Sequence, residues 1–174
     1  MAEIAALAPS TSGRRRLEVW LPLVVLALDQ ITKELVRRSL ELHESMTIIP
    51  GLVDFTYVRN TGAAFGILNS ADFAYKTVII AIIATAGLIG VAVYSASLAS
   101  HQLAARIGLA LIIGGAAGNL VDRVLVGYVV DFVDVYWRDY HFWAFNLADS
   151  AITIGVTVMI LDMLGVGANV SKTA

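Results

Sequence analysis

Cysteine is absent from the 174 residues, and charged residues make up only 15% of them. Without cysteine the chain can form no disulfide, no thiolate-bound zinc site, no iron–sulfur cluster and no cysteine nucleophile. The net charge is −2, so there is no basic field to attract nucleic acid, and we expect no nucleic-acid partner.

Apolar residues are correspondingly abundant. They make up 58% of the chain, and the mean hydropathy is +0.77, whereas soluble domains are about 45–50% apolar and about 25% charged. The composition therefore predicts an integral membrane protein, and the length suits one compact domain.

Four apolar stretches are long enough, or nearly so, to cross a bilayer, which takes roughly 20 helical residues. We expect spans at about 20–35, 75–98, 103–121 and 145–166, within a single domain over residues 17–168. Residues 1–16 are expected to be a flexible cytoplasmic tail, and residues 169–174 a cytoplasmic C-terminus. The arginines at 14–16 favour a cytoplasmic N-terminus, and the first span lacks a small-residue cleavage site, which favours an anchor over a cleaved signal peptide.

Two segments between the expected spans have the pattern of strands. Residues 53–59 read VDFTYVR and residues 128–137 read YVVDFVDVYW, both with alternation and many β-branched or aromatic residues. They predict a small extracytoplasmic β element on the membrane surface.

Polar residues inside the apolar stretches are costly and usually face the interior of a helix bundle. Asp29 and Lys33 are four residues apart, on one face of the first span. They are interpreted either as a structural ion pair or as part of a site, with equal weight.

The third span combines small and polar residues. Gly114 and Gly118 fit the small-xxx-small pattern that allows close helix packing, and packing is the favoured interpretation. Asn119, Asp122 and Arg123 follow at spacings of three and four, which predicts one polar face near the outer end of the helix. Asp122 and Arg123 could also simply satisfy each other or carbonyl groups at the helix end, an interpretation given about equal weight.

The fourth span carries a polar stripe. Asn146, Asp149, Thr153 and Thr157 follow at helical spacing. Asn146 is a candidate N-cap, but capping does not explain Asp149, which has no basic neighbour one turn away. Its partner is therefore expected from another helix.

Asp131, in the second strand-like segment, could lie across a cleft from Asp149. Two aspartates that share one proton can activate water, the ionised one taking a proton from water while the protonated one donates to the scissile carbonyl. From spacing alone, Asp122 or Asp134 could take the place of Asp131. A proton-coupled carrier that uses Asp149 and Arg123, or an assembly protein built on the glycine face, are the alternatives.

Other catalytic classes lack their motifs. There is no H-E-x-x-H, and the three histidines are isolated in the sequence, so no metal site is expected. The serine-hydrolase elbow G-x-S-x-G and a phosphate-binding glycine loop are also missing.

Five motifs, in order along the chain, resemble the signal peptidase II family of bacterial intramembrane aspartic proteases. They are DQITK at 29–33, RNTGAAFG at 59–66, GGAAGNLVDRV at 114–124, GYVVDF at 127–132 and FNLADS at 145–150. The resemblance implies four transmembrane helices, an extracytoplasmic β cradle and a short mobile helical lid.

The same resemblance implies roles for individual residues. Asp131 and Asp149 correspond to the catalytic pair, a choice over Asp122 and Asp134 that comes from the resemblance alone. The supporting positions, for substrate or for the pair, are Asn60, Asn119, Asp122, Arg123 and Asn146, and Asp29 and Lys33 form the structural polar pair. No cofactor is implied.

By resemblance, the substrate is a prolipoprotein with a diacylglyceryl group on its lipobox cysteine, and cleavage falls just before that cysteine. Membrane lipid is the further partner, and cyclic peptide and macrolide-type antibiotics are the expected inhibitors. We expect a monomer in the bacterial inner membrane, with both termini cytoplasmic and the site at the extracytoplasmic face.

Overall fold

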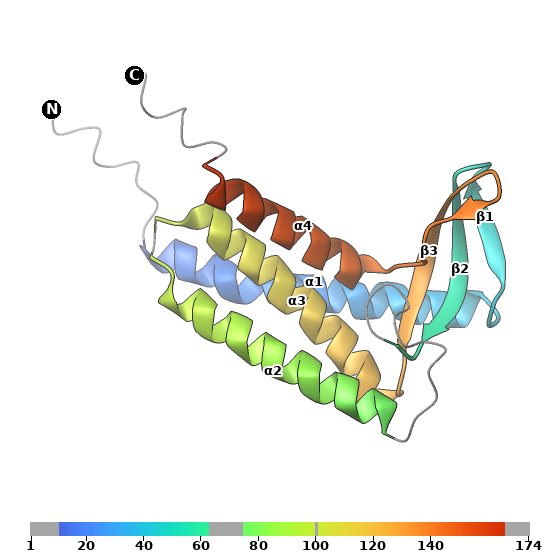
Figure 1. The fold of residues 1–174 in the computed structure, drawn as a ribbon, viewed down its shortest axis with the longest axis horizontal. Coiled ribbons are helices and arrows are strands. Elements are labelled where there is room, and N and C mark those ends of the chain that lie inside the picture. The colour runs from blue at the N-terminus through green and yellow to red at the C-terminus, as the bar shows by residue number, and fades with distance from the viewer. Residues whose placement is uncertain (1–10, 63–74, 100, 166–174) are drawn as a thin grey trace, which may run out of the picture.

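The computed structural model describes residues 11–62, 75–99 and 101–165 as four long helices and a small sheet. The helices are α1 (Thr11–Ser39), α2 (Lys76–Ser97), α3 (Leu103–Leu125) and α4 (Leu147–Met163), and the strands are β1 (Ser45–Ile49), β2 (Val53–Asn60), β3 (Val129–Trp137) and β4 (Tyr140–His141). The helices lie side by side, and the sheet lies at the end of the bundle where α1 ends and α4 begins (Figure 1).

Helix α1 is longer than the predicted first span at both ends. It begins at Thr11, inside the segment 1–16 that we expected to be a tail, and it ends at Ser39. Arginine is a good helix former, so the arginines at 14–16 extend the helix instead of interrupting it. The expected tail up to residue 10 lies outside the described residues.

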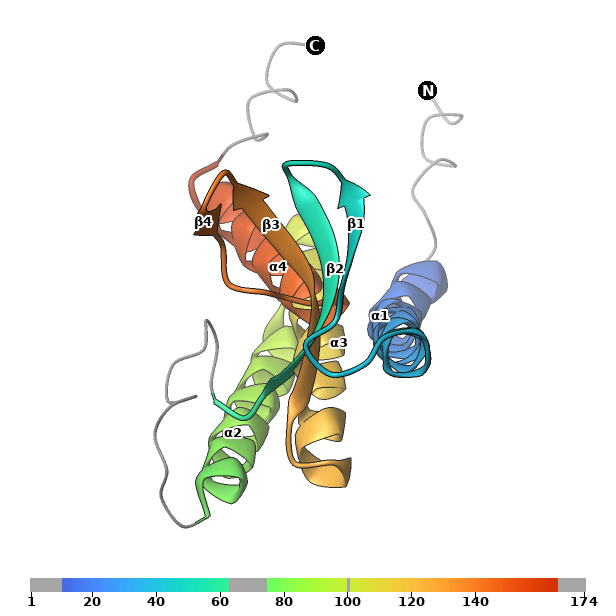
Figure 2. The same cartoon turned by 90° about the vertical axis from the view of Figure 1, so that its right-hand side faces the viewer.

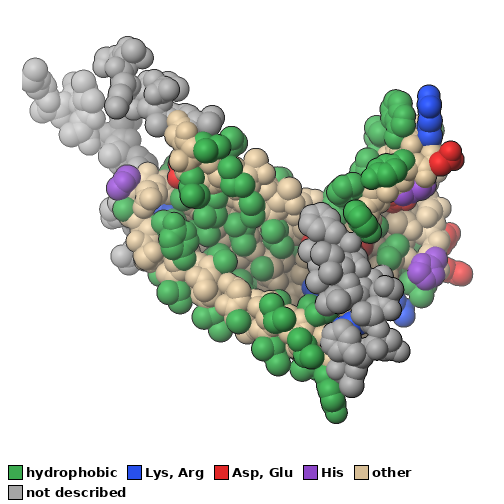
Figure 3. Space-filling model, viewed as in Figure 1, with side chains coloured by type: hydrophobic (Ala, Val, Ile, Leu, Met, Phe, Trp, Pro, Cys, Tyr) green, Lys and Arg blue, Asp and Glu red, His purple; other side chains and the backbone are tan. Residues whose placement is uncertain are grey.

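Among the described helices, two are long and apolar enough to cross a membrane, namely α2 and α3. Helix α4 has only 17 residues, and α1 carries charged residues along its length. Figure 3 shows hydrophobic side chains over the visible faces of the helices, while most of the visible charged side chains lie near the sheet.

The sheet is antiparallel, in the order β1-β2-β3-β4. Strands β2 and β3 match the two predicted segments closely, whereas β1 and β4 were not predicted. Figure 2 shows the first three strands side by side, with α1 to one side. Val36 of α1 packs against Tyr57, Val130 and Phe132 of the sheet, and this apolar cluster fixes the sheet on the bundle.

Small residues allow α3 to pack closely against two helices at once. A β-carbon on Gly114 would lie 2.9 Å from the Pro22 carbonyl oxygen of α1, and one on Gly108 would lie 2.7 Å from the Gly155 carbonyl oxygen of α4. The predicted packing role of Gly114 and Gly118 therefore concerns α1, while Gly108 and Gly115 form a second close contact, with α4.

Replacing Gly115 by Ala is expected to lower the free energy of unfolding by about 1–3 kcal/mol. The added β-carbon would overlap the Ala148 carbonyl oxygen and lie 2.9 Å from Ile152 Cγ1, so α4 would have to move. Thermal unfolding in detergent measures the effect. Gly87→Ala in α2 is the matched control, because a β-carbon there meets nothing within 4 Å; an equal melting temperature for both variants would contradict the close α3–α4 contact.

Candidate active site

Asp131 and Asp149 face one cleft of about 910 Å³ between α2, α3, α4 and the sheet. Most of its walls are apolar, and its polar lining includes both aspartates together with Asn60, Asn119 and Arg123. The structure thus brings two carboxyl groups from separate elements into one largely apolar cleft.

Strand pairing positions Asp131. In the β2–β3 register, Val58 lies opposite Asp131 and Asn60 opposite Val129, so Asn60 and Asp131 are diagonal neighbours on one face. The Asn60 Nδ2 donates to Asp131 Oδ2 at 2.9 Å, and Asn146 Nδ2 donates to Asp131 Oδ1 at 2.7 Å. Both oxygens of a carboxyl group that is only 3% exposed therefore have an amide donor.

The first turn of α4 positions Asp149. Asn146 is the N-cap, its Oδ1 accepting from Asp149 N at 2.9 Å, and Asp149 Oδ2 accepts in return from Asn146 N at 3.3 Å. This reciprocal pair is a capping box. The prediction of Asn146 as the N-cap is confirmed. The expectation that capping does not explain Asp149 is wrong, because the Asp149 side chain is the second half of the capping box.

The expected partner for Asp149 from another helix is Asn119 of α3. Its Nδ2 donates to Asp149 Oδ1 at 2.8 Å. Asn119 therefore connects α3 and α4 at the point where the cleft is polar.

Burial and, to a smaller extent, the nearby negative charge of Asp149 raise the pKa of Asp131 to about 7, against the opposing effect of the two amide donors. Ordinarily this carboxyl would titrate near 3.8. A carboxyl group with such a pKa can hold a proton at neutral pH, as an acid-base site requires.

The raised pKa of Asp131 predicts a pH-dependent stability. Its folded pKa is about 7 against an ordinary 3.8, so its contribution is fully present below about pH 4 and is lost as the pH rises through about 7. Relative to Asp131→Asn, wild type is expected to lose up to about 4 kcal/mol over that interval.

Melting temperatures of both proteins in detergent, from pH 4 to pH 8, check this expectation. Asp149, Arg123 and Lys33 also act electrostatically on Asp131, and all three are present in both proteins. A difference in melting temperature that does not change with pH would contradict the raised pKa.

A buried ionic network lies behind the aspartates, on the side of α1. Asp29 and Lys33 are both fully buried, and their charged atoms are 2.8 Å apart. Lys33 Nζ is also 3.0 Å from Asp122 Oδ2, and Arg37 Nη2 is 3.0 Å from Asp122 Oδ1. The predicted pair is thus half of a network with two carboxylates and two cations.

The network also reaches α4. Asp29 Oδ1 accepts from the backbone N–H of Ala148 at 3.0 Å, one of the N–H groups at the start of α4 that have no partner within the helix. Asp29 therefore joins α1 to the turn that holds Asp149.

Asp122 and Arg123 do not form the pair that their adjacency suggested. Asp122 binds the cations of α1, whereas Arg123 donates to the carbonyl oxygens of Asn119 at 3.1 Å and Gly62 at 2.9 Å. The expectation of one polar face is therefore corrected, because successive residues on a helix point about 100° apart. Asp122 is 1% exposed and supports the site from behind, while Arg123 lines the cleft.

The other candidate aspartate, Asp134, lies farther along β3. Its Oδ2 is 2.8 Å from His141 Nδ1 on β4. Neither Asp134 nor Asp122 is among the lining residues of the cleft.

Sequence reasoning missed Gln30 and Arg37. Gln30 Nε2 donates to the Gly118 carbonyl oxygen at 3.2 Å, and Arg37 binds Asp122. Positions 30, 33 and 37 share one helical face, so the spacing contained the signal for both residues.

Part of the expected site lies outside the described residues. The motif at 59–66 is described only as far as Gly62, and no helix among the described ranges corresponds to the expected short lid. Over those same ranges, no group of three or more His, Asp or Glu side chains could hold a metal ion.

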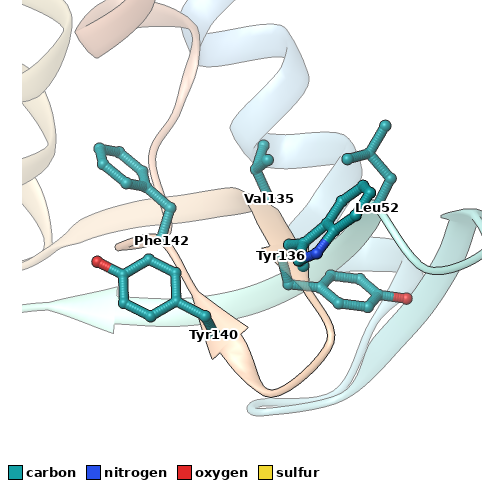
Figure 4. Close-up of a pocket in the computed structure, with 6 residues that line it drawn as sticks. Leu52, Val135, Tyr136, Tyr140 and Phe142 are labelled. Atoms are coloured by element: carbon teal, nitrogen blue, oxygen red, sulfur yellow. The ribbon is translucent and has the colours of Figure 1, made fainter.

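A second hollow, of about 320 Å³, lies beside the cleft, among apolar and aromatic side chains of β3, β4 and the turn before β2 (Figure 4). Phe142 lines both hollows. The apolar surface of the cleft therefore continues onto the sheet.

Comparisons with known proteins agree with this architecture. A family model for signal peptidase (SPase) II matches residues 21–165. Lipoprotein signal peptidases of Geobacter sulfurreducens and Geobacter metallireducens are 48% and 45% identical over 139 and 141 residues, which cover 80% and 81% of this chain and 86% of each relative.

Two solved structures, each described as a bacterial membrane enzyme, are also similar. One has a TM-score of 0.77 and 34% identity, and the match covers 90% of this chain and 93% of that one. The other has a TM-score of 0.76 and 32% identity, covering 84% and 92%. The chain therefore belongs to the signal peptidase II family.

Proposed function

We propose that this chain is a membrane aspartic endopeptidase that removes the signal peptide from diacylglyceryl-modified prolipoproteins. Membership of the family supports the peptidase activity and the prolipoprotein substrate. The observation that carries the aspartic mechanism is the pair Asp131 and Asp149, which face one apolar cleft with amide donors on both carboxyl groups.

In the proposed mechanism the pair holds one proton. The ionised carboxylate takes a proton from water, whose oxygen attacks the scissile carbonyl, while the protonated carboxyl donates its proton to the carbonyl oxygen. The tetrahedral intermediate then collapses, the carbonyl re-forms, and a proton passes to the departing amine. A pKa of about 7 at Asp131 supports a shared proton near neutral pH, which belongs to the pair as a whole.

The cleft suits a peptide that arrives from a membrane. Ile80, Ile83 and Ala84 of α2 form part of its apolar wall, against which a signal-peptide helix can pack while the lipid tails remain in the bilayer. Arg123, which lines the cleft, is proposed to bind carbonyl oxygens of the peptide through its remaining N–H groups. Cleavage is proposed to fall just before the lipidated cysteine.

We propose that all four helices cross the inner membrane, with both termini cytoplasmic and the sheet extracytoplasmic. The sheet lies at the end of the bundle opposite the start of α1 and the end of α4 (Figure 1), which supports this arrangement. Asp131 and Asp149 then lie near the outer surface.

A monomer is proposed as the working unit, with no cofactor. Cyclic peptide and macrolide-type antibiotics that fill the cleft are proposed inhibitors. Like the substrate, they would lie against the apolar walls of the cleft, beside the two carboxyl groups.

The proton-coupled carrier is not favoured, since the relatives are named lipoprotein signal peptidases. The assembly protein leaves the two aspartates without a role. Ion-dependent uptake into proteoliposomes would identify a carrier, whereas the peptidase needs no gradient.

The test incubates the purified chain, in detergent with a metal chelator, with a diacylglyceryl-modified prolipoprotein, and follows the products by mass spectrometry. The expected result is a signal peptide released by a cut before the lipidated cysteine. The same prolipoprotein without its diacylglyceryl group is the control for substrate class. No cleavage by a folded sample would contradict the proposed function.

A further inference from the structure

Three asparagine side chains donate to the two aspartates, and each does so through its amide nitrogen. Asn60 and Asn146 donate to Asp131, and Asn119 donates to Asp149. An amide group can turn over and exchange its oxygen and nitrogen, so something must hold each one with its nitrogen toward the carboxyl group.

Backbone donors hold two of the three amides. The Gly62 N–H donates to Asn60 Oδ1 at 2.9 Å, and the Asp149 N–H donates to Asn146 Oδ1 at 2.9 Å. Since these donors belong to the main chain, the orientation of both amides follows from the fold itself.

Asn119 is held differently, by the side chain of Lys33 on another helix. Lys33 Nζ donates to Asn119 Oδ1 at 2.9 Å, on the opposite side of the amide from Asp149. An ammonium group can donate but cannot accept, so the oxygen of Asn119 must face Lys33 and its nitrogen must face Asp149.

Lys33 itself has no freedom to turn away. It is fully buried, and its three N–H groups have three acceptors, one each from Asp29, Asp122 and Asn119. Both carboxylates therefore hold the ammonium group against the amide oxygen.

Asn146 adds little to this orientation. Its Nδ2 is 3.2 Å from Asn119 Oδ1, but the two hydrogens on that nitrogen also serve Asp131 Oδ1 at 2.7 Å and the Val130 carbonyl oxygen at 3.2 Å. Three acceptors share two hydrogens, and this 3.2 Å contact is longer than the 2.9 Å contact from Lys33, which is therefore the main donor to the Asn119 oxygen.

We propose that Lys33 is a positioning residue of the peptidase, whose ammonium group fixes the amide of Asn119 so that an N–H donor always faces Asp149. This inference rests on the proposed function, since it assigns a purpose to a contact with the catalytic pair. Without the ammonium group the amide can present its oxygen to Asp149, and that carboxyl group loses the donor that orients it.

A double-mutant cycle tests the proposal, with wild type, Lys33→Met, Asn119→Ala and the double variant in the cleavage assay. Lys33→Met is expected to lower kcat roughly 10- to 100-fold, as for other groups that orient a reacting side chain. KM is expected to stay within about twofold, because Lys33 does not line the cleft. In the Asn119→Ala background the same change is expected to lower kcat less than about threefold, because the group that Lys33 orients is already gone.

Because Lys33→Met leaves Asp29 without its partner, the cycle is repeated with Asp29→Asn/Lys33→Met, which removes one charge of each sign. There too, the fall in kcat is expected to be smaller in the Asn119→Ala background than in the presence of the Asn119 amide. If removing Lys33 lowers kcat by the same factor with and without the Asn119 amide, in both cycles, the proposal is overturned. Lys33 then has a structural role only.

Wild type and Asp149→Asn, run in the same assay, separate the two hypotheses. Cleavage by wild type and none by Asp149→Asn supports the proposed function, and the cycle then decides on Lys33. Cleavage that survives Asp149→Asn would overturn the aspartic mechanism, and the Lys33 proposal with it.

Discussion

Replacing Asp149 or Asp131 by Asn is expected to lower the rate of prolipoprotein cleavage by roughly 10³-fold or more, since general acid-base catalysis contributes about 10²–10⁴-fold and the two groups act as a unit. Asparagine keeps the shape of the side chain and an acceptor oxygen. It cannot hold or release the proton that the mechanism moves, so the chemistry is lost while the fold remains.

The measurement is the amount of signal peptide released over time, followed by mass spectrometry, together with the melting temperature of each variant. At position 149, an asparagine oxygen can still accept from Asn146 N and so preserve the capping box. We therefore expect helix α4 to begin at the same residue in Asp149→Asn.

Two matched controls lie on the same elements. Asp162→Asn changes an exposed carboxyl group on α4, and Asp134→Asn changes one on β3 whose partner is His141. Both variants are expected to cleave the prolipoprotein at a rate within about twofold of wild type, since neither residue lines the cleft. Near-normal cleavage by Asp149→Asn or Asp131→Asn would show that the catalytic pair is wrongly assigned.

Lys33→Met is expected to lower the free energy of unfolding by about 3–5 kcal/mol, the usual effect of removing one partner from a buried ion pair. Asp29 and Lys33 are both 0% exposed. Without Lys33, the two buried carboxylates Asp29 and Asp122 share one cation, Arg37, which contacts Asp122. Unfolding in detergent, by heat or denaturant, measures the loss.

Arg38→Met is the control, because Arg38 and Glu34 repeat the geometry of the buried pair on the surface. Both pairs join residues four apart on α1, at 2.7 Å and 2.8 Å, but Arg38 is 76% exposed. An exposed pair contributes about 0–1 kcal/mol, so Arg38→Met is expected to lower the free energy of unfolding much less than Lys33→Met, which also removes the contacts with Asp122 and Asn119.

The charge-balanced variant Asp29→Asn/Lys33→Met is expected to recover part of the stability, since removing both members of a buried pair is often close to neutral. Similar losses for Lys33→Met and Arg38→Met would instead show that the buried network contributes little to the fold.

The polar positions could be predicted from helical spacing because charge inside an apolar stretch is costly and has to face other protein groups. Asp29 with Lys33 and the need of Asp149 for a partner on another helix both followed from this reasoning. The two central strands followed from alternation in residues 53–59 and 128–137. Family resemblance then supplied the choice of Asp131, and the family itself is confirmed.

Spacing could not show which neighbour each polar group would meet. Asp122 and Arg123 are adjacent, yet one meets the cations of α1 and the other meets carbonyl groups in the cleft, because their directions depend on where the neighbouring helices pack. The register that places Asn60 beside Asp131 depends in turn on a bulge in β2 between Phe55 and Val58, and no pattern in the sequence marks that bulge.

The capping box at the start of α4 has a consequence for how the protein folds. Asn146 and Asp149 are three residues apart, so their two hydrogen bonds form as soon as a single helical turn does, on a timescale of roughly a microsecond or less. Asp131, 15 positions before Asn146, joins them when β3 folds back against the start of α4. The contacts at the start of α4 are therefore local in sequence, whereas the donors Asn60 and Asn119, 71 positions from Asp131 and 30 from Asp149, reach the two carboxyl groups only through the tertiary fold.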